Sequence, residues 1–419
     1  MFSLALRSRA VPPLLLMIGL IALPQLGETI YTPSLASLAQ YFQIDARAAQ
    51  STLTLFFIGF SVGIFVWGAV SDARGRRPAI LMALAVYVAG CVLCLLATDI
   101  GQLLIGRFIQ GAGAAACSVV VQAICREAFR GDRQLQVFAV IGTFIPLSTA
   151  LGPFAGGWLA MATTWWASFI VLLLAGILLW AGCIVALPET RQPAPSPAPS
   201  FIKLLRKMAG DRRLLGMTLL IGLPNGIVFS FYGEAPFLLI ERRGLSSGEY
   251  GTLCMLAVSG SIAGGWLLRR LSRSGWRSSR LIGLGLGLLT LASGLLLATA
   301  PAWSAPDQPA ALALFALLGA LLFAGFTLCT IACLHRALEH YQHALGRAGA
   351  LFGLAYYLIV AAATEGMSVL HNGSAITLPA YALVLSLIAV VVFMVMVRSH
   401  LHKPVMKGAD LALITAENS

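Results

Sequence analysis

The sequence predicts an all-α membrane protein with twelve transmembrane helices in two six-helix, pseudo-symmetric halves. Of its 419 residues, 59% are hydrophobic and only 11% are charged, and the mean hydropathy is +0.88. Soluble domains carry about 25% charged residues. The chain also divides into apolar runs close to the ~20 residues that a helix needs to cross a bilayer, whereas barrel strands would be about half as long.

Twelve apolar runs follow one another, separated by short polar breaks. They lie at 12–38, 51–71, 79–97, 101–124, 135–157, 166–187, 214–240, 249–268, 281–299, 310–334, 347–370 and 376–397. Arg7 and Arg9 precede the first run, as in a signal peptide, but the length of this run and the glutamate within it indicate a helix that stays in the mature protein.

The basic residues predict the orientation of the chain. Twelve helices place both chain ends on one side, and the ends and loops of that side hold 24 of the 28 Lys and Arg residues. The opposite loops hold only Arg47, Arg242 and Arg243, and Arg107 lies inside a run. We therefore expect a multi-pass membrane protein with both termini cytoplasmic. The same distribution explains the net charge of +12 without nucleic acid as a partner.

One long break divides the chain. We expect an N-terminal half at 1–187, a cytoplasmic linker at 188–213, a C-terminal half at 214–398 and a cytoplasmic tail at 399–419. The proline-rich first part of the linker favours an extended spacer. Apolar residues then recur at helical spacing, which predicts either a short amphipathic helix on the cytoplasmic leaflet or a solvated segment; they are Phe201, Leu204, Leu205 and Met208.

Four ionisable residues lie inside apolar runs: Glu28, Arg107, Glu234 and Glu365. A charge at bilayer depth costs at least ~2.5–3.5 kcal/mol, so these side chains should face the bundle interior or water. At 1.5 Å per residue the three acids lie about 24–30 Å from the cytoplasmic starts of their helices, and Arg107 lies at a similar depth. We expect them to share one layer of a cavity, although the two later acids could instead extend to the outer interface.

Glu28 and Arg107 form the predicted proton-coupling pair. Burial favours a neutral acid and a nearby guanidinium favours the carboxylate, so an acid between these influences can load and release a proton near neutral pH. Arg107 stays charged and acts as a fixed counter-charge. The alternative is a buried ion pair that only holds helices together.

Aromatic residues flank the intramembrane acids. Rings on a cavity wall would suit apolar or cationic substrates, although aromatics in a helical bundle also serve packing. Together with the acids, these rings give the predicted substrate cavity: Tyr31, Phe231, Glu234, Tyr356 and Glu365.

The sequence predicts no enzyme, cofactor or metal. The eight cysteines lie within apolar runs, so we interpret them as buried hydrophobic residues rather than disulfides or ligands. A phosphate-binding loop of the Gly-x4-Gly-Lys-Ser/Thr type does not occur, which disfavours transport driven by the chain's own ATPase. A membrane enzyme or receptor stays an alternative, but no nucleophile–base pair and no large extracellular domain is evident.

The loop after the second run, residues 68–78, carries a motif. An aspartate in a tight cytoplasmic turn can pair with arginines and with the positive end of a helix. The stretch resembles the signature between helices 2 and 3 of the major facilitator superfamily, which implies a cytoplasmic gate. The matching residues are Gly68, Asp72, Gly75, Arg76 and Arg77, while Ala73 replaces the arginine that usually follows the aspartate.

Two further stretches narrow the resemblance. Residues 104–114 resemble the helix-4 motif of the superfamily, whose arginine, here Arg107, is linked to proton coupling. Residues 150–159 resemble the helix-5 motif of its drug:proton antiporters, with Gly152, Pro153, Gly156 and Gly157. Glycines let helices approach closely and a proline bends a helix, as a rocking interface requires.

Helix 1, with Glu28, Tyr31 and Pro33, resembles that of the bicyclomycin- and chloramphenicol-resistance exporters, although Glu234 stands where these proteins usually have a small residue. The resemblance implies a monomer in the lipid bilayer that exchanges protons for small drug-like molecules, apolar or cationic, by alternating access. Such multidrug efflux would confer antibiotic resistance. One alternative is export of an endogenous metabolite or siderophore, with Arg107 binding an anionic substrate. Another is proton-coupled uptake, which the helix-5 motif argues against.

Overall fold

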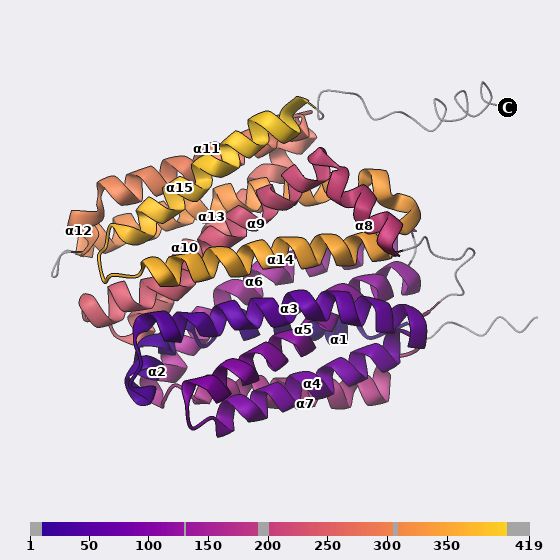
Figure 1. Ribbon diagram of the computed structural model, residues 1–419, viewed down its shortest axis with the longest axis horizontal. Helices are drawn as coiled ribbons and strands as arrows, with labels where there is room; N and C mark the ends of the chain where they lie inside the picture. The colour runs from indigo at the N-terminus through magenta and orange to yellow at the C-terminus, as the bar shows by residue number, and fades with distance from the viewer. Residues whose placement is uncertain (1–10, 130, 192–200, 305–308, 400–419) are drawn as a thin grey trace, which may run out of the picture.

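The computed structural model describes residues 11–129, 131–191, 201–304 and 309–399. Within these ranges the chain forms helices and loops without a strand, and twelve helical spans are long and apolar enough to cross a membrane (Figure 1). The prediction of twelve transmembrane helices is confirmed. Arg7, Arg9, most of the proline-rich spacer and the tail from residue 400 onward lie outside the described residues.

The first six spans form the N-terminal half. The first span is broken: α1 (Leu14–Thr29) is followed by η1 (Thr32–Ser34) and α2 (Leu35–Phe42). The others are α3 (Ala46–Arg74), α4 (Arg76–Leu96), α5 (Ile100–Ala128), α6 (Gly131–Ala162) and α7 (Ala167–Ala186).

The last six spans form the C-terminal half. Of the two alternatives for the stretch after the spacer, the structure has the short helix, α8 (Phe201–Gly210). The remaining elements are α9 (Arg212–Pro236) with η2 (Phe237–Arg242), α10 (Ser247–Arg273), α11 (Ser278–Ala298), α12 (Ala300–Ser304), α13 (Pro309–Ala337), η3 (Glu339–Ala344), α14 (Leu345–Leu370), and α15 (Thr377–Val392) with η4 (Phe393–Val397).

Polar residues in the short breaks begin several of these helices. Asp45, Asp99 and Asp211 each accept a hydrogen bond from a backbone N–H in the first turn of α3, α5 and α9. Ser246 and Glu249 form a capping box at the start of α10. These caps satisfy N–H groups that would otherwise lack partners, and they fix where the chain re-enters the apolar layer.

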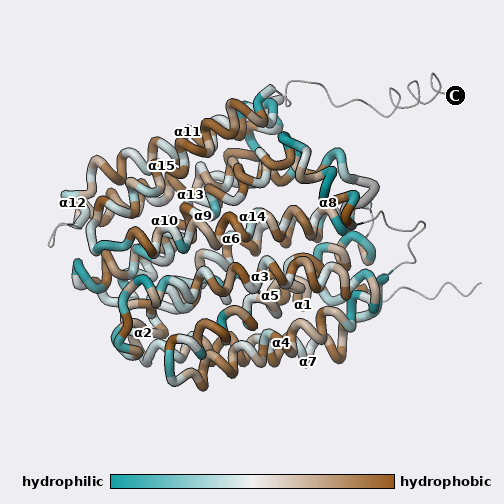
Figure 2. The backbone as a smooth tube through the Cα atoms, in the orientation of Figure 1, coloured by the Kyte–Doolittle hydropathy of each residue, from teal (hydrophilic) through white to brown (hydrophobic). Residues whose placement is uncertain are grey.

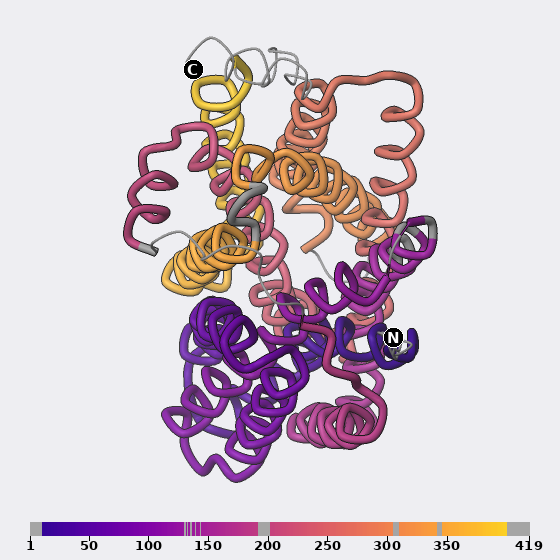
Figure 3. The backbone as a smooth tube through the Cα atoms, turned by 90° about the vertical axis from the view of Figure 1, so that its right-hand side faces the viewer, coloured from indigo at the N-terminus to yellow at the C-terminus, as the bar shows by residue number. Residues whose placement is uncertain are grey.

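The two ends of the bundle differ in charge. We call the end that carries Arg76, Arg126, Arg277 and α8 the basic end, and the opposite one the far end. Hydrophilic residues collect at both ends and hydrophobic residues fill the middle (Figure 2). Seen from the basic end, the two halves lie side by side (Figure 3). Across their interface α3 packs on α14, and α6 packs on α10.

The break in the first span follows from Pro33, which has no N–H to donate to the preceding turn. The carbonyl of Thr29 accepts instead from the hydroxyl of Thr32 at 2.9 Å. Helix α6 approaches this break so closely that a Cβ on Gly156 would overlap the carbonyl oxygen of Ile30. The break therefore brings α1 and α6 together beside Glu28.

Other glycines of α6 and α10 allow the two halves to touch. A Cβ on Gly157 would overlap the carbonyl oxygen of Ser247, and one on Gly251 would crowd the carbonyl oxygen of Pro153. Gly152 packs against Thr29 of α1 in the same manner. Close approach of α6, which the helix-5 motif predicts, is thus present on both of its faces.

Candidate functional site

Glu28 is buried at the end of α1, close to the interface between the halves. Its side chain is 1% exposed, and Oε1 has no hydrogen-bond partner among the described residues. The charge of Arg107 acts on Glu28, and a charge on Glu28 would in turn act on Tyr356 and Tyr357 of the other half. An unbonded buried carboxylate is costly when it is charged, so this position favours a group that exchanges protons.

Arg107 of α5 is completely buried in a cage of carbonyl groups and rings. Its Nη1 donates to the carbonyl oxygen of Gly27, at 3.1 Å, and to the side-chain oxygen of Gln110. The guanidinium carbon lies 4.2 Å from the ring centre of Tyr31 and 4.4 Å from that of Phe56. These partners stabilise a buried cation without a carboxylate in direct contact.

The residues next to Arg107 tie it to α3. The hydroxyl groups of Tyr31 and Thr52 are 3.0 Å apart, and Nε of Arg107 donates to the carbonyl oxygen of Thr52 at 3.4 Å. Nη2 has no hydrogen-bond partner among the described residues. A movement of α3 would therefore change the surroundings of Arg107.

A cluster of five aromatic residues, which we call the aromatic roof, crosses the interface near Glu28. The ring centres of Phe57 and Phe229 are 4.5 Å apart, as are those of Phe60 and Tyr357, and Tyr356 lies 4.4 Å from Tyr357. The roof takes residues from α3, α9 and α14. One of its members, Tyr356, is among the cavity residues that the sequence predicted.

A cavity of about 470 Å³ lies below the aromatic roof, between the halves and toward the basic end. It extends along α14 from Gly346 to Tyr356, about 15 Å at 1.5 Å per residue, and Arg126 of α5 and His335 of α13 also line it. Pockets for drug-sized ligands are typically 300–1,000 Å³. The cavity is therefore large enough for a small molecule.

The far end is closed by a group that we call the far-end cluster: Gln50, Glu234 and His371. Glu234 is completely buried, and its Oε2 accepts a hydrogen bond from Nε2 of Gln50 at 2.7 Å, across the interface between the halves. Nδ1 of His371 lies 2.8 Å from the same oxygen and 2.9 Å from Oε1. Two polar contacts to one carboxylate hold α3, α9 and the end of α14 together.

The pKa of His371 is raised. The hydrogen bond to Glu234 is the largest cause, partial burial acts in the opposite direction, and the charges of Glu234, Glu241 and Asp45 add to the rise. The closed far end therefore favours the charged imidazolium, and the contact between His371 and Glu234 is an ion pair when the ring is protonated.

Glu365 lies on the same face of the interface as the far-end cluster. Its Oε2 accepts a hydrogen bond from the hydroxyl of Ser51 at 3.3 Å, and the hydroxyls of Thr54 and Thr364 are 3.2 Å apart. Both contacts join α3 to α14. Glu234 and Glu365 thus lie at the closed end, and in this conformation neither lines the 470 Å³ cavity.

Phe231 points into the interior of the C-terminal half. Its ring packs against Phe315, with ring centres 5.6 Å apart, and against Phe323 at 5.8 Å. Tyr31 is also buried, against Arg107, so Tyr356 is the predicted cavity residue that lines the cavity here.

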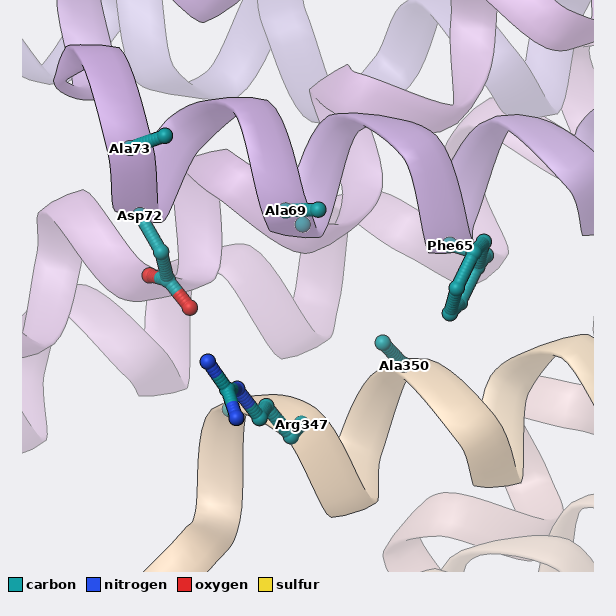
Figure 4. Close-up of a pocket in the computed structure, with 8 residues that line it drawn as sticks. Phe65, Ala69, Asp72, Ala73, Arg347 and Ala350 are labelled. Atoms are coloured by element: carbon teal, nitrogen blue, oxygen red, sulfur yellow. The ribbon is translucent and has the colours of Figure 1, made fainter. Parts of the chain in front are cut away.

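The predicted gate motif forms a network at the basic end. Arg76 pairs with Asp72 at 2.7 Å and with Glu127 of α5 at 2.7 Å. Gly75 has φ +109°, a value that favours glycine, and it joins α3 to α4. Asp72 faces Arg347 of α14 across a space of about 400 Å³, which Gly68 also lines (Figure 4).

Glu189, after α7, holds the start of α4. Its carboxylate accepts hydrogen bonds from the backbone N–H groups of Arg76, at 2.9 Å, and Arg77, at 3.1 Å. Partial burial alone would raise the pKa of Glu189, but hydrogen bonds from Arg76, Arg191 and Arg77 hold it below its usual value. Arg77 itself donates to the carbonyl oxygen of Ile184. The motif thus anchors to its own half.

Several residues at these places escaped the sequence analysis. Gln50 and His371 had no local signal, because only the tertiary fold brings residues 50, 234 and 371 together. The signal for Gln110 was its position three residues after Arg107 on one helix face. All eight cysteines are buried and unpaired, as predicted. Among the described residues, no group of three or more potential ligands could hold a metal ion.

Twelve helices that are long and apolar enough to cross a membrane, arranged in two halves with a cavity between them, are the architecture of a membrane transporter. The chain belongs to the Major Facilitator Superfamily, whose sequence profile matches residues 17–364. The superfamily resemblance that the motifs predicted is confirmed, and so is the likeness to drug-efflux members.

Comparisons with individual proteins agree with this assignment. The chain is 31% identical to an uncharacterised transporter of Rickettsia felis over 91% of this chain and 95% of the relative. It is 26% identical to the chloramphenicol resistance protein CraA of Acinetobacter baumannii over 67% of this chain and 68% of the relative. The crystal structure of a D-xylose-proton symporter shares the fold, with a TM-score of 0.72, 14% identity, and coverage of 92% of this chain and 97% of the symporter.

Proposed function

We propose that this transporter exports small drug-like molecules, apolar or cationic, in exchange for protons. The carrying observation is the buried Glu28, which lies near the caged Arg107 and the aromatic roof and whose Oε1 accepts no hydrogen bond from any residue that the structure describes. The relative that confers chloramphenicol resistance supports export, as does the close packing of α6 on α1 and α10.

The proposed orientation places the basic end in the cytoplasm of a bacterial cell, with the protein in the inner membrane and both termini inside. It rests on the sequence, in which the chain ends and loops assigned to that side hold 24 of the 28 basic residues. The 470 Å³ cavity would then take substrate from the cytoplasm while the far-end cluster keeps the outer side shut.

The proposed cycle begins with a charged Glu28 and substrate below the aromatic roof. When the far end opens, Glu28 takes a proton from outside, the negative charge of the site is lost, and a cationic or polarisable substrate leaves. Closing the far end and releasing the proton inward resets the site. One proton moving down 100 mV supplies about 2.3 kcal/mol, and each pH unit adds about 1.4, which is enough for about a 50-fold gradient or more.

The test compares Glu28→Gln with the unmodified chain in inverted membrane vesicles. Glutamine keeps the shape of the side chain but carries no exchangeable proton, so we expect substrate-dependent proton release to fall at least about 100-fold, while unenergised substrate exchange persists. Glu249→Gln, an exposed far-end acid, serves as the control. Undiminished proton coupling in Glu28→Gln would remove the proposed role of Glu28.

A second candidate function is export of an anionic endogenous metabolite, and Arg126 favours it. Arg126 lines the cavity and forms no ion pair with the described carboxylates. Arg107, in contrast, lies behind Tyr31 and Phe56, away from the cavity. A substrate panel of both charges decides: Arg126→Gln should impair only anionic substrates if this function holds, and should leave cationic ones unaffected.

A further inference from the structure

Helices α11 and α15 lie at the outer edge of the C-terminal half (Figure 1). A groove outside the transport pathway runs between them. Two adjoining hollows of about 540 and 530 Å³ share Gly287 and Val390 and together form it. From Arg280 to Gly294 it follows α11 for about 21 Å, which exceeds the ~15 Å of one leaflet's hydrocarbon. The groove is long enough for an acyl chain.

Positive charge collects at only one end of this groove. Arg277 and Arg280, from the start of α11, and Arg398, which follows η4, line its mouth and are exposed. None of the three pairs with a carboxylate of the described chain. The positive end of the α11 dipole adds to the same field. This mouth attracts an anion, phosphate above all.

The groove beyond its mouth is apolar. Gly283 and Gly287 form its floor, and Phe393, Met394 and Leu291 form its walls. A Cβ added at Gly287 would meet no atom within 4 Å, so the space above this glycine is open. Inside the bundle, side chains of neighbouring helices would fill such a space. Here the leucines around it are exposed, so the space opens to the outer surface of the protein, which faces lipid.

The mouth also lies at the depth of lipid headgroups. Trp276, directly before Arg277, is 39% exposed at the basic end, and exposed tryptophans of membrane proteins concentrate at the level of the headgroups. An anionic ligand whose apolar tail begins at that depth is a phospholipid.

We propose that the groove between α11 and α15 binds one anionic phospholipid. Its phosphate contacts Arg277, Arg280 and Arg398, and one acyl chain lies over Gly287. Charge complementarity at the mouth and the apolar length behind it distinguish this site from general contact with bilayer lipid, and basic pockets between transmembrane helices bind such headgroups. The proposal does not depend on the direction or substrate of transport.

Native mass spectrometry of the full-length protein in detergent, titrated with phosphatidylglycerol or phosphatidylcholine, measures the proposed binding. A basic residue near a lipid headgroup contributes about fivefold to affinity, so the triple change of Arg277, Arg280 and Arg398 to Gln should weaken phosphatidylglycerol binding on the order of 100-fold. The control changes Arg269, Arg270 and Arg273 of α10 to Gln, which removes equal charge at the same end. Equal losses in the two triple variants would overturn the proposal.

A second variant tests the acyl-chain path. A Cβ at Gly287 or at Gly265 of α10 would meet no atom within 4 Å. Gly287→Leu therefore places a side chain in the groove, and Gly265→Leu places the same side chain at an equally open glycine outside it. We expect only Gly287→Leu to lower the affinity for phosphatidylglycerol, by at least about tenfold. The melting temperature of this variant in lipid-free detergent should be unchanged. Retained binding in Gly287→Leu overturns the proposal. A dimer of the unmodified chain that Gly287→Leu converts to monomer also overturns it, because a second copy would then occupy the groove.

Discussion

Glu28 of α1 and Glu234 of α9 end the leading helices of the two halves, yet their surroundings differ. Within the described part of the chain Oε1 of Glu28 has no hydrogen-bond partner, whereas both oxygens of Glu234 contact His371 and one also contacts Gln50. A fully bonded carboxylate is fixed in geometry and charge, while an unbonded one can change its protonation with little rearrangement. The contrast supports proton exchange at Glu28 and closure at Glu234.

Arg107 has no counterpart of its kind beside Glu234. The guanidinium is held by carbonyl oxygens and two rings, whereas the cation beside Glu234 is a titratable imidazolium. A permanent charge can bias a neighbouring acid through a whole cycle, and a titratable one can release its partner. The two regions are therefore suited to different steps.

The largest effect should come from Arg107→Lys. An ammonium group cannot donate along the guanidinium plane and stack between Tyr31 and Phe56 at once, so we expect proton-coupled efflux to fall about 100-fold or more. Arg126→Lys is the control, because Arg126 lies at the cavity and not in the cage. Efflux by Arg107→Lys within threefold of the unmodified rate would make Arg107 a packing residue.

A large structural effect, with little effect on coupling, should follow Glu234→Gln. This change removes the ion pair with His371, and a neutral amide replaces the charged carboxylate that accepts from Gln50. The closed conformation of the far end should therefore lose about 2–3 kcal/mol of stability. Thr98 and Ala298 are exposed at the far ends of the two halves, and spin labels there would measure the distance between the halves. We expect a larger population of molecules with a long distance between the two labels, which corresponds to an open far end. Glu249→Gln, an exposed far-end acid that does not act on His371, should leave the distances unchanged.

The same variant can contradict the comparison. If Glu234→Gln leaves the distance distribution as it was but abolishes proton coupling, then Glu234 exchanges protons and the assignment of the two acids is reversed. Loss of both properties would show that the two acids act as one unit.

An intermediate effect should come from pH. The closed far end raises the pKa of His371 above its ordinary value of 6.5. Its contribution to closure is therefore fully present below about pH 6.5 and is lost as pH rises through the raised pKa. The labelled pair should shift toward long distances between pH 6.5 and alkaline pH. His371→Gln should flatten this dependence, and an unchanged slope in that variant would exclude His371 as its source.

The sequence predicted the fold well because each transmembrane helix carries its own signal. Length, hydropathy and the polar caps at Asp45, Asp99 and Asp211 are local properties, and they place helices without knowledge of the partners. Glu28 and Arg107 could also be singled out as candidates, since an ionisable residue within an apolar run can be recognised from the sequence alone.

The arrangement around these residues could not be predicted from the sequence. Gln50 and His371 are ordinary polar residues near helix ends, and only the tertiary fold brings them to Glu234. Phe231 failed to join the cavity wall because a three-residue offset from Glu234 does not fix which side of α9 faces the other half. Rotation of a helix about its axis depends on packing, which periodicity weakly specifies when the helix is apolar all round.

The smallest effect should come from Ser51→Ala, and it sharpens the comparison by separating a peripheral contact from the far-end cluster. The hydroxyl of Ser51 donates to Glu365 at 3.3 Å, a long hydrogen bond, and Glu365 is only partly buried, so water can replace the lost donor. A typical hydrogen bond contributes about 0.5–1.5 kcal/mol, and this one should lie near the lower limit. We expect about a twofold change in the closed population of the labelled pair, against at least a tenfold change for Glu234→Gln.

Thr54→Val, which removes the contact with Thr364 on the same pair of helices, is the matched variant. A larger effect of Ser51→Ala than of Glu234→Gln would move the closing contact from α9 to α14, because the carboxylate that holds the far end shut would then be Glu365.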